Sequence, residues 1–112
     1  MNDPKLKLAI ARMLPELIWL NTTRDSRGPV HCWKGEKDSL TGQDREILET
    51  EWLYVMQWVE QQMAKEEVVS FSMALRSVTG EGCVTDYKMI SATFNQRATA
   101  MCRVKGIDYA TN

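Results

Sequence analysis

The clearest hydrophobic pattern in the chain covers residues 50–63, TEWLYVMQWVEQQM. Apolar residues recur there at steps of three and four, which predicts a helix. Tyr54 and Trp58, four positions apart, give this helix a second apolar side. Each aromatic ring can remove roughly 150–250 Å² from water, so we expect neighbours to pack on two sides of the helix. The first side consists of Leu48, Trp52, Val55, Val59 and Met63.

A second helix is predicted at the start of the chain. Asp3 precedes Pro4, and this order suits a helix N-terminus, where an Asp oxygen accepts from free backbone N–H groups and proline needs none. An apolar stripe at helical spacing follows. Pro15 disfavours helical geometry at the residue before it, so we expect the helix to end near Met13 or Leu14.

Two more helices are predicted in the second half. Residues 68–78 fit both the alternation of a strand and the spacing of a helix; we favour the helix, with Gly80 as its left-handed cap. Thr93 and Gln96 have the spacing of a reciprocal cap in front of a helix over 94–105, which Gly106 closes. Residues 84–90 are expected to be irregular, or at most one edge strand.

Two short apolar segments, 17–20 and 30–33, flank a run of turn-forming residues. They predict a β-hairpin with Trp19 and Trp33 facing a helix, because two strands alone are marginal in water. Residues 35–43 are polar and predict a loop. Helical character is expected to resume near Asp44, either as one helix to Ala64 or with a fresh start capped by Thr50.

These elements predict a single α+β domain over residues 1–112, mainly helical, with about four helices and one β-hairpin packed on the central helix. The apolar runs are too short to span a membrane. Three cysteines, without an apolar leader segment, indicate free thiols in a reducing cytoplasm.

The net charge of −1 offers no positive field for nucleic acid. The charge is uneven, however, because residues 36–67 hold nine acidic and three basic side chains. Such a run is usually a solvated face. Its alternative interpretation is an acidic contact surface for a basic partner.

Catalytic and metal-binding motifs are weak in this sequence. His31 and Cys32 are neighbours, but adjacent side chains of a strand point to opposite faces and cannot pair. Zinc held by His31, Cys32, Cys83 and Cys102 lacks any paired ligand spacing. There is no phosphate-binding glycine loop or nucleophile elbow. We therefore expect a non-enzymatic protein without cofactor or metal.

Two binding surfaces remain as candidates. Core packing is the favoured interpretation of Tyr54 and Trp58; if one side of the helix stays uncovered, they form a protein-binding patch or a homodimer seam. The candidate protein-binding residues are Glu46, Glu49, Glu51, Tyr54, Trp58 and Glu60. The alternative is a DNA-binding C-terminal helix, for which the candidates are Lys88, Arg97, Arg103 and Lys105.

Two segments carry a resemblance to known proteins. Glu51-Trp52-Leu53 leads a helix that ends in Val59-Glu60, and the run ATFNQRATAMC over 92–102 closes with Gly106-Ile107. In these features the C-terminal half resembles small accessory proteins from the early regions of tailed bacteriophages and prophages. The resemblance implies a protein that binds and modulates or inhibits a host protein in the bacterial cytoplasm, such as a defence nuclease.

Overall fold

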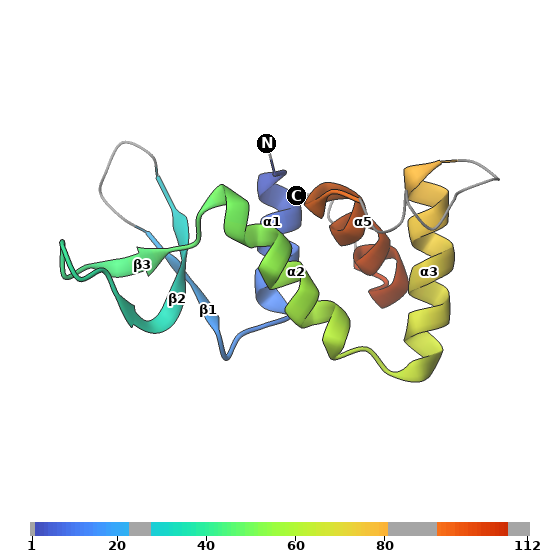
Figure 1. Ribbon diagram of the computed structural model, residues 1–112, viewed down its shortest axis with the longest axis horizontal. Coiled ribbons are helices and arrows are strands. Elements are labelled where there is room, and N and C mark those ends of the chain that lie inside the picture. The colour runs from blue at the N-terminus through green and yellow to red at the C-terminus, as the bar shows by residue number, and fades with distance from the viewer. Residues whose placement is uncertain (1, 23–27, 81–91, 108–112) are drawn as a thin grey trace.

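The computed structural model describes residues 2–22, 28–80 and 92–107 of the 112-residue chain. This part of the chain forms four α-helices and a three-stranded antiparallel sheet, which confirms the predicted mainly helical α+β class. The molecule is elongated, 48 × 26 × 24 Å, with the sheet at one end and helices α3 and α5 at the other (Figure 1). The elements are α1 (Pro4–Arg12), β1 (Ile18–Asn21), β2 (Val30–Lys37), β3 (Asp44–Glu46), the 3-10 turn η1 (Glu49–Glu51), α2 (Trp52–Gln61), α3 (Lys65–Thr79) and α5 (Phe94–Lys105).

Helix α1 begins and ends as the sequence predicts. The Asp3 side chain accepts a hydrogen bond from the backbone N–H of Lys5 at 2.9 Å, and Pro4 occupies the first turn. The last helical residue is Arg12, just short of the Met13 or Leu14 end expected from Pro15. The apolar stripe of α1 is buried, with Ile10 fully enclosed.

The predicted hairpin is present, but it is part of a larger sheet. Strands β1 and β2 pair antiparallel from Ile18–Trp33 to Asn21–Val30. The predicted loop over residues 35–43 is correct only for residues 38–43. Residues 35–37 belong to β2, which continues to Lys37 and pairs with β3, where Glu46 lies opposite Cys32. The sheet therefore has the order β1-β2-β3.

The extension of β2 is hidden in the sequence because its side chains are solvated. Residues 34–37 are all exposed, so no hydrophobic alternation marks them. Gly35 has a φ of 77° inside an irregular part of the β2–β3 ladder, a conformation that suits glycine. The turn is closed by Asp38, whose carboxylate accepts from the backbone N–H of Leu40 at 2.8 Å.

The central helix begins later than expected. The prediction of helix from Asp44 is wrong because residues 44–46 form β3, and Thr50 does not cap α2 but lies inside η1. The turn is held instead by Glu51, whose carboxylate accepts from the backbone N–H of Leu48 at 3.4 Å. Leu48 itself is 58% exposed rather than part of the buried stripe.

The core runs from α1 through α2 to α5. Trp52, Val55 and Met56 of α2 are at most 1% exposed, and the Trp52 ring packs against Phe94 of α5 with ring centroids 5.6 Å apart. His31 of β2 meets the same Trp52 ring edge-on at 5.3 Å. The sheet thus joins the helical body at the start of α2 rather than along its length (Figure 1).

The two C-terminal helices form where the sequence predicts them. Residues 68–78 belong to α3, which resolves the helix-or-strand ambiguity in favour of the helix. The prediction that Gly80 forms a left-handed cap is wrong, because its φ of 167° is extended. At α5, Thr93 accepts from the Gln96 N–H at 3.2 Å and Gly106 is left-handed, as predicted.

Some predictions cannot be placed in the fold. Residues 84–90, with Cys83 and Lys88, lie outside the described residues. None of the helices that the structure describes has the length and apolar character to cross a bilayer.

Candidate functional site

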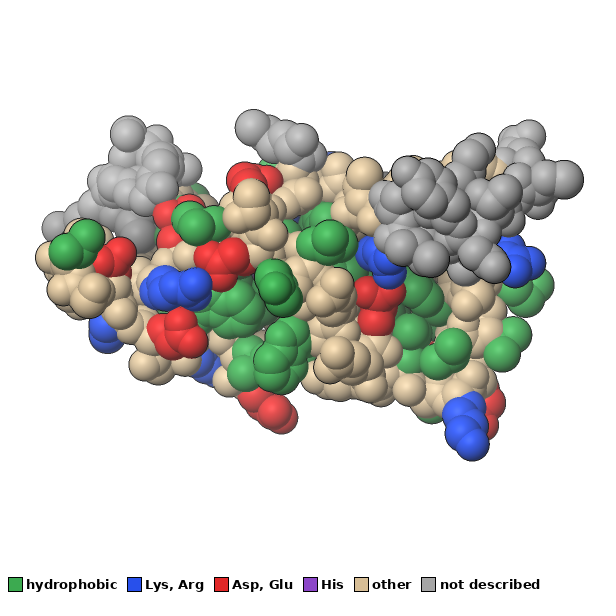
Figure 2. All heavy atoms as spheres, viewed as in Figure 1, with side chains coloured by type: hydrophobic (Ala, Val, Ile, Leu, Met, Phe, Trp, Pro, Cys, Tyr) green, Lys and Arg blue, Asp and Glu red, His purple; other side chains and the backbone are tan. Residues whose placement is uncertain are grey.

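A cleft of about 310 Å³ opens where the sheet meets α2. Three of its lining side chains are aromatic and three are charged, and they come from four different elements. Figure 2 shows hydrophobic side chains over α2 next to a group of acidic and basic side chains on the sheet side. The lining residues are Trp33 and Glu36 of β2, Arg45 of β3, Glu51 of η1, and Tyr54 and Trp58 of α2.

The aromatic side of the cleft is the second apolar side of α2. Tyr54 is 66% exposed and Trp58 is 48% exposed, whereas Trp52 of the same helix is 1% exposed. The favoured expectation that core packing covers this second side is therefore wrong. The structure instead leaves the uncovered aromatic patch that was the alternative, because the described neighbours of α2 contact its other side.

Hydrogen bonds and ion pairs fix the other wall. The Glu51 carboxylate accepts from the Trp33 indole Nε1–H at 3.0 Å and from an Arg45 guanidinium N–H at 3.1 Å. Arg45 also pairs with Glu36 at 3.3 Å. Because Glu51 satisfies the indole N–H, the Trp33 ring is held in place, and a rigid aromatic wall loses little conformational entropy on binding.

The remaining acidic candidates do not join this cleft. Glu49 lies beside α1, where ion pairing with Lys7 lowers the pKa of its carboxyl group. Glu60 faces α5 and pairs with Arg97 at 2.6 Å; burial outweighs this attraction and raises the Glu60 pKa. Glu46 is on β3, outside the residues that line the cleft. Only Glu51, Tyr54 and Trp58 of the six candidates come together there.

The cations proposed for DNA binding are mostly engaged within the protein. Arg97 is held by Glu60, and Lys105 pairs with Glu67 of α3 at 2.5 Å. Arg103 is exposed on α5. Two of the three described candidates therefore have their charge neutralised by a neighbouring helix, which weakens the field that a phosphate backbone needs.

The two cysteine candidates that the structure describes are not in the thiolate form that a nucleophile requires. Cys32 and Cys102 are free and buried. Burial raises the pKa of Cys32, and it raises that of Cys102 to about 11, so both thiols are protonated at neutral pH. Among residues 2–22, 28–80 and 92–107, no three His, Cys, Asp or Glu side chains gather closely enough to hold a metal ion.

Sequence reasoning missed half of the cleft. Trp33 was expected to face a helix. Glu36 was assigned to a loop, and Arg45 was assigned to the start of a helix. The β2–β3 pairing brings both of them beside Glu51, and the only local signal for that pairing is the turn around Asp38 and Gly42.

Comparison with models of protein families, with curated proteins and with solved structures finds no match to this chain.

Proposed function

We propose that this chain is a non-enzymatic binding protein that docks on another protein through the cleft between β2 and α2. Tyr54 and Trp58 supply the observation that supports this function most strongly, because two large rings of one helix lie in contact with water. The cleft combines Trp, Tyr and Arg, the residue types that most often dominate the energy of protein interfaces. The resemblance to phage accessory proteins adds that the partner is a host protein in the bacterial cytoplasm, which the chain modulates or inhibits.

The charged wall of the cleft, opposite α2, supports the binding of a partner protein. Its charged groups already satisfy one another through the Glu51–Arg45–Glu36 pairs, so a partner need not supply a counter-ion for each of them. An interface built this way avoids burying an unpaired charge, which would cost several kcal/mol.

Affinity capture from a bacterial lysate treated with nuclease tests the proposal. The intact chain is expected to retain a protein partner, and Tyr54→Ala/Trp58→Ala is expected to lose it. Val69→Ala/Met73→Ala is the matched control, because these α3 side chains are 62% and 67% exposed but lie outside the cleft. Equal retention by both double variants would overturn the proposal. In a parallel capture from untreated lysate, retention only of material that nuclease removes would favour the DNA-binding alternative.

Sedimentation distinguishes a homodimer from binding to a different protein. If a second copy covers the cleft, sedimentation of the purified chain shows a dimer that Tyr54→Ala/Trp58→Ala converts to monomer. A chain that stays monomeric at all concentrations excludes a second copy as the occupant of the cleft.

A further inference from the structure

The cleft between β2 and α2 carries an unbalanced negative charge. Glu36 and Glu51 are acidic, and Arg45 is the one cation among the described residues that line the cleft. The Arg45 guanidinium pairs with both carboxylates, at 3.3 Å from Glu36 and 3.1 Å from Glu51. Two carboxylates therefore share one guanidinium, and one negative charge remains beside the aromatic rings.

Glu36 is the carboxylate at which another molecule can reach this excess charge. The Glu51 side chain is 18% exposed, and it accepts from the Trp33 indole and the Leu48 backbone N–H as well as from Arg45. The Glu36 side chain is 56% exposed, and its Oε2 atom forms the pair with Arg45. Its Oε1 atom has no hydrogen-bond partner among the described residues, so it can accept from an outside donor.

The surface next to the cleft is acidic as well. A neighbouring hollow of about 330 Å³ shares Arg45 and Glu51 with the cleft, and Asp38, Asp44 and Glu46 also line it. Residues 36–51 hold six acidic and two basic side chains, which gives −4 in a chain whose net charge is −1. Such a local field attracts a positively charged surface and orients it during encounter.

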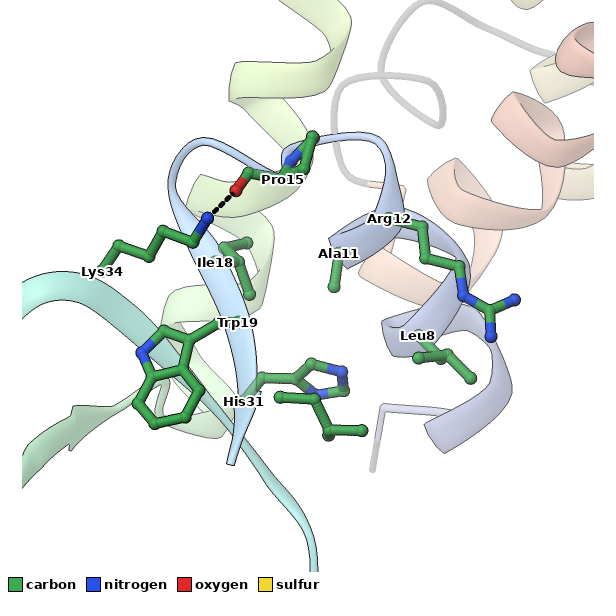
Figure 3. A pocket seen from close by; sticks show the side chains of 9 residues that line it. Leu8, Ala11, Arg12, Pro15, Ile18, Trp19, His31 and Lys34 are labelled. Carbon is green, nitrogen blue, oxygen red and sulfur yellow. Dashed lines mark hydrogen bonds between the residues drawn. The ribbon is translucent and has the colours of Figure 1, made fainter. Parts of the chain in front are cut away.

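The charge has the opposite sign on another side of the sheet. A hollow of about 350 Å³ between α1 and strands β1 and β2 is lined by Arg12 and Lys34, with no acidic side chain among the described residues of its wall. Figure 3 shows the Lys34 ammonium group donating to the backbone carbonyl of Pro15. A positively charged partner would be repelled on this side and attracted at the cleft.

We propose that the cleft receives an arginine side chain of the partner protein, an inference that rests on the proposed function. The guanidinium donates to the available oxygen of Glu36 and packs against the exposed rings of Tyr54 and Trp58. Ring faces attract cations, and a planar, weakly hydrated guanidinium suits rings and a carboxylate better than an ammonium group does. The cleft volume of about 310 Å³ is at the low end of the roughly 300–1,000 Å³ of ligand pockets, which suits one side chain.

A peptide tests the arginine without the partner. The probe is acetyl-Gly-Arg-Gly-amide, and its control carries citrulline, the neutral isostere, in place of arginine. In the ¹⁵N-labelled full chain, the indole N–H resonances of Trp33 and Trp58 are expected to shift and saturate together, while that of Trp52, which is 1% exposed, stays unmoved. The citrulline peptide should bind at least about tenfold more weakly, because it has no charge for the carboxylate or the rings.

Two matched variants separate Glu36 from the overall charge of the chain. Glu36→Gln removes the excess charge but keeps the shape of the side chain, and it should weaken the arginine peptide about tenfold. Glu16→Gln removes the same charge from an exposed position outside the cleft and should bind as wild type does. Three results would each overturn the arginine site: unmoved Trp33 and Trp58 resonances, equal affinity for the citrulline peptide, or equal effects of the two variants.

The captured partner distinguishes this inference from the proposed function. Glu36→Gln is expected to bind the partner about tenfold more weakly than Glu16→Gln does. If Tyr54→Ala/Trp58→Ala loses the partner while Glu36→Gln binds it as wild type does, the arginine is wrong and docking through the cleft stands. If Tyr54→Ala/Trp58→Ala binds the partner as wild type does, both proposals are wrong.

Discussion

Helix α2 carries two tryptophans that lie in opposite environments. Trp52 is 1% exposed, between Phe94 of α5 and His31 of β2, whereas Trp58 is 48% exposed at the edge of the cleft. Both belong to apolar stripes at helical spacing. Their difference shows that a hydrophobic pattern identifies side chains that leave water, but not whether the same chain or another molecule covers them.

Replacement of Trp52 should have the largest effect on the fold. Trp52→Ala leaves a cavity where α1, α2, α5 and the sheet meet, and such truncations cost about 3–5 kcal/mol. Denaturant titration followed by circular dichroism measures the loss of unfolding free energy. A loss below about 1 kcal/mol would show that Trp52 is not a core residue and would remove the contrast within α2.

On the inner side of α2, the contribution of Glu60 to the free energy of unfolding should depend on pH. Burial raises the folded-state pKa of Glu60 above 4.5, so protonation favours folding, and this stabilisation is present below pH 4.5 and lost as pH rises through the folded pKa. Glu60→Gln imitates the protonated side chain. The unfolding free energy of wild type minus that of Glu60→Gln is therefore expected to fall as pH rises from 4 to 7.

Glu49 is the matched control for this measurement. Its pKa is lowered mainly by the hydrogen bond from Lys7, so the stabilisation it provides is present above pH 4.5 and lost as pH falls through the folded pKa. The corresponding difference for Glu49→Gln should rise with pH. A rise for Glu60→Gln as well would mean that the attraction of Arg97 outweighs the burial of Glu60.

The exposed side of α2 should give the smallest change in stability. Tyr54→Ala and Trp58→Ala each remove a side chain that is largely in contact with water, 66% and 48% exposed, so each is expected to cost at most about 1 kcal/mol. Thermal and denaturant unfolding check this expectation. A loss close to that of Trp52→Ala would assign these rings to the core.

The sequence predicts the helices well because their signals are local. Asp3 with Pro4, and Thr93 with Gln96, are capping patterns that act within one turn, and the structure contains both. Strand β3 lacks such a signal because Asp44, Arg45 and Glu46 are all charged, and they form a strand only by pairing with β2. Half of the cleft depends on that pairing, so Arg45 and Glu36 could not be predicted as part of it.

The central claim is that Tyr54 and Trp58 contact a partner protein rather than the core. The most direct test is the dissociation constant of the purified, captured partner for wild type, Tyr54→Ala/Trp58→Ala and Val69→Ala/Met73→Ala. Interface hot spots contribute about 2 kcal/mol or more, so the cleft variant should bind at least about 30-fold more weakly, with the α3 variant unchanged. Equal dissociation constants for all three proteins would contradict the account.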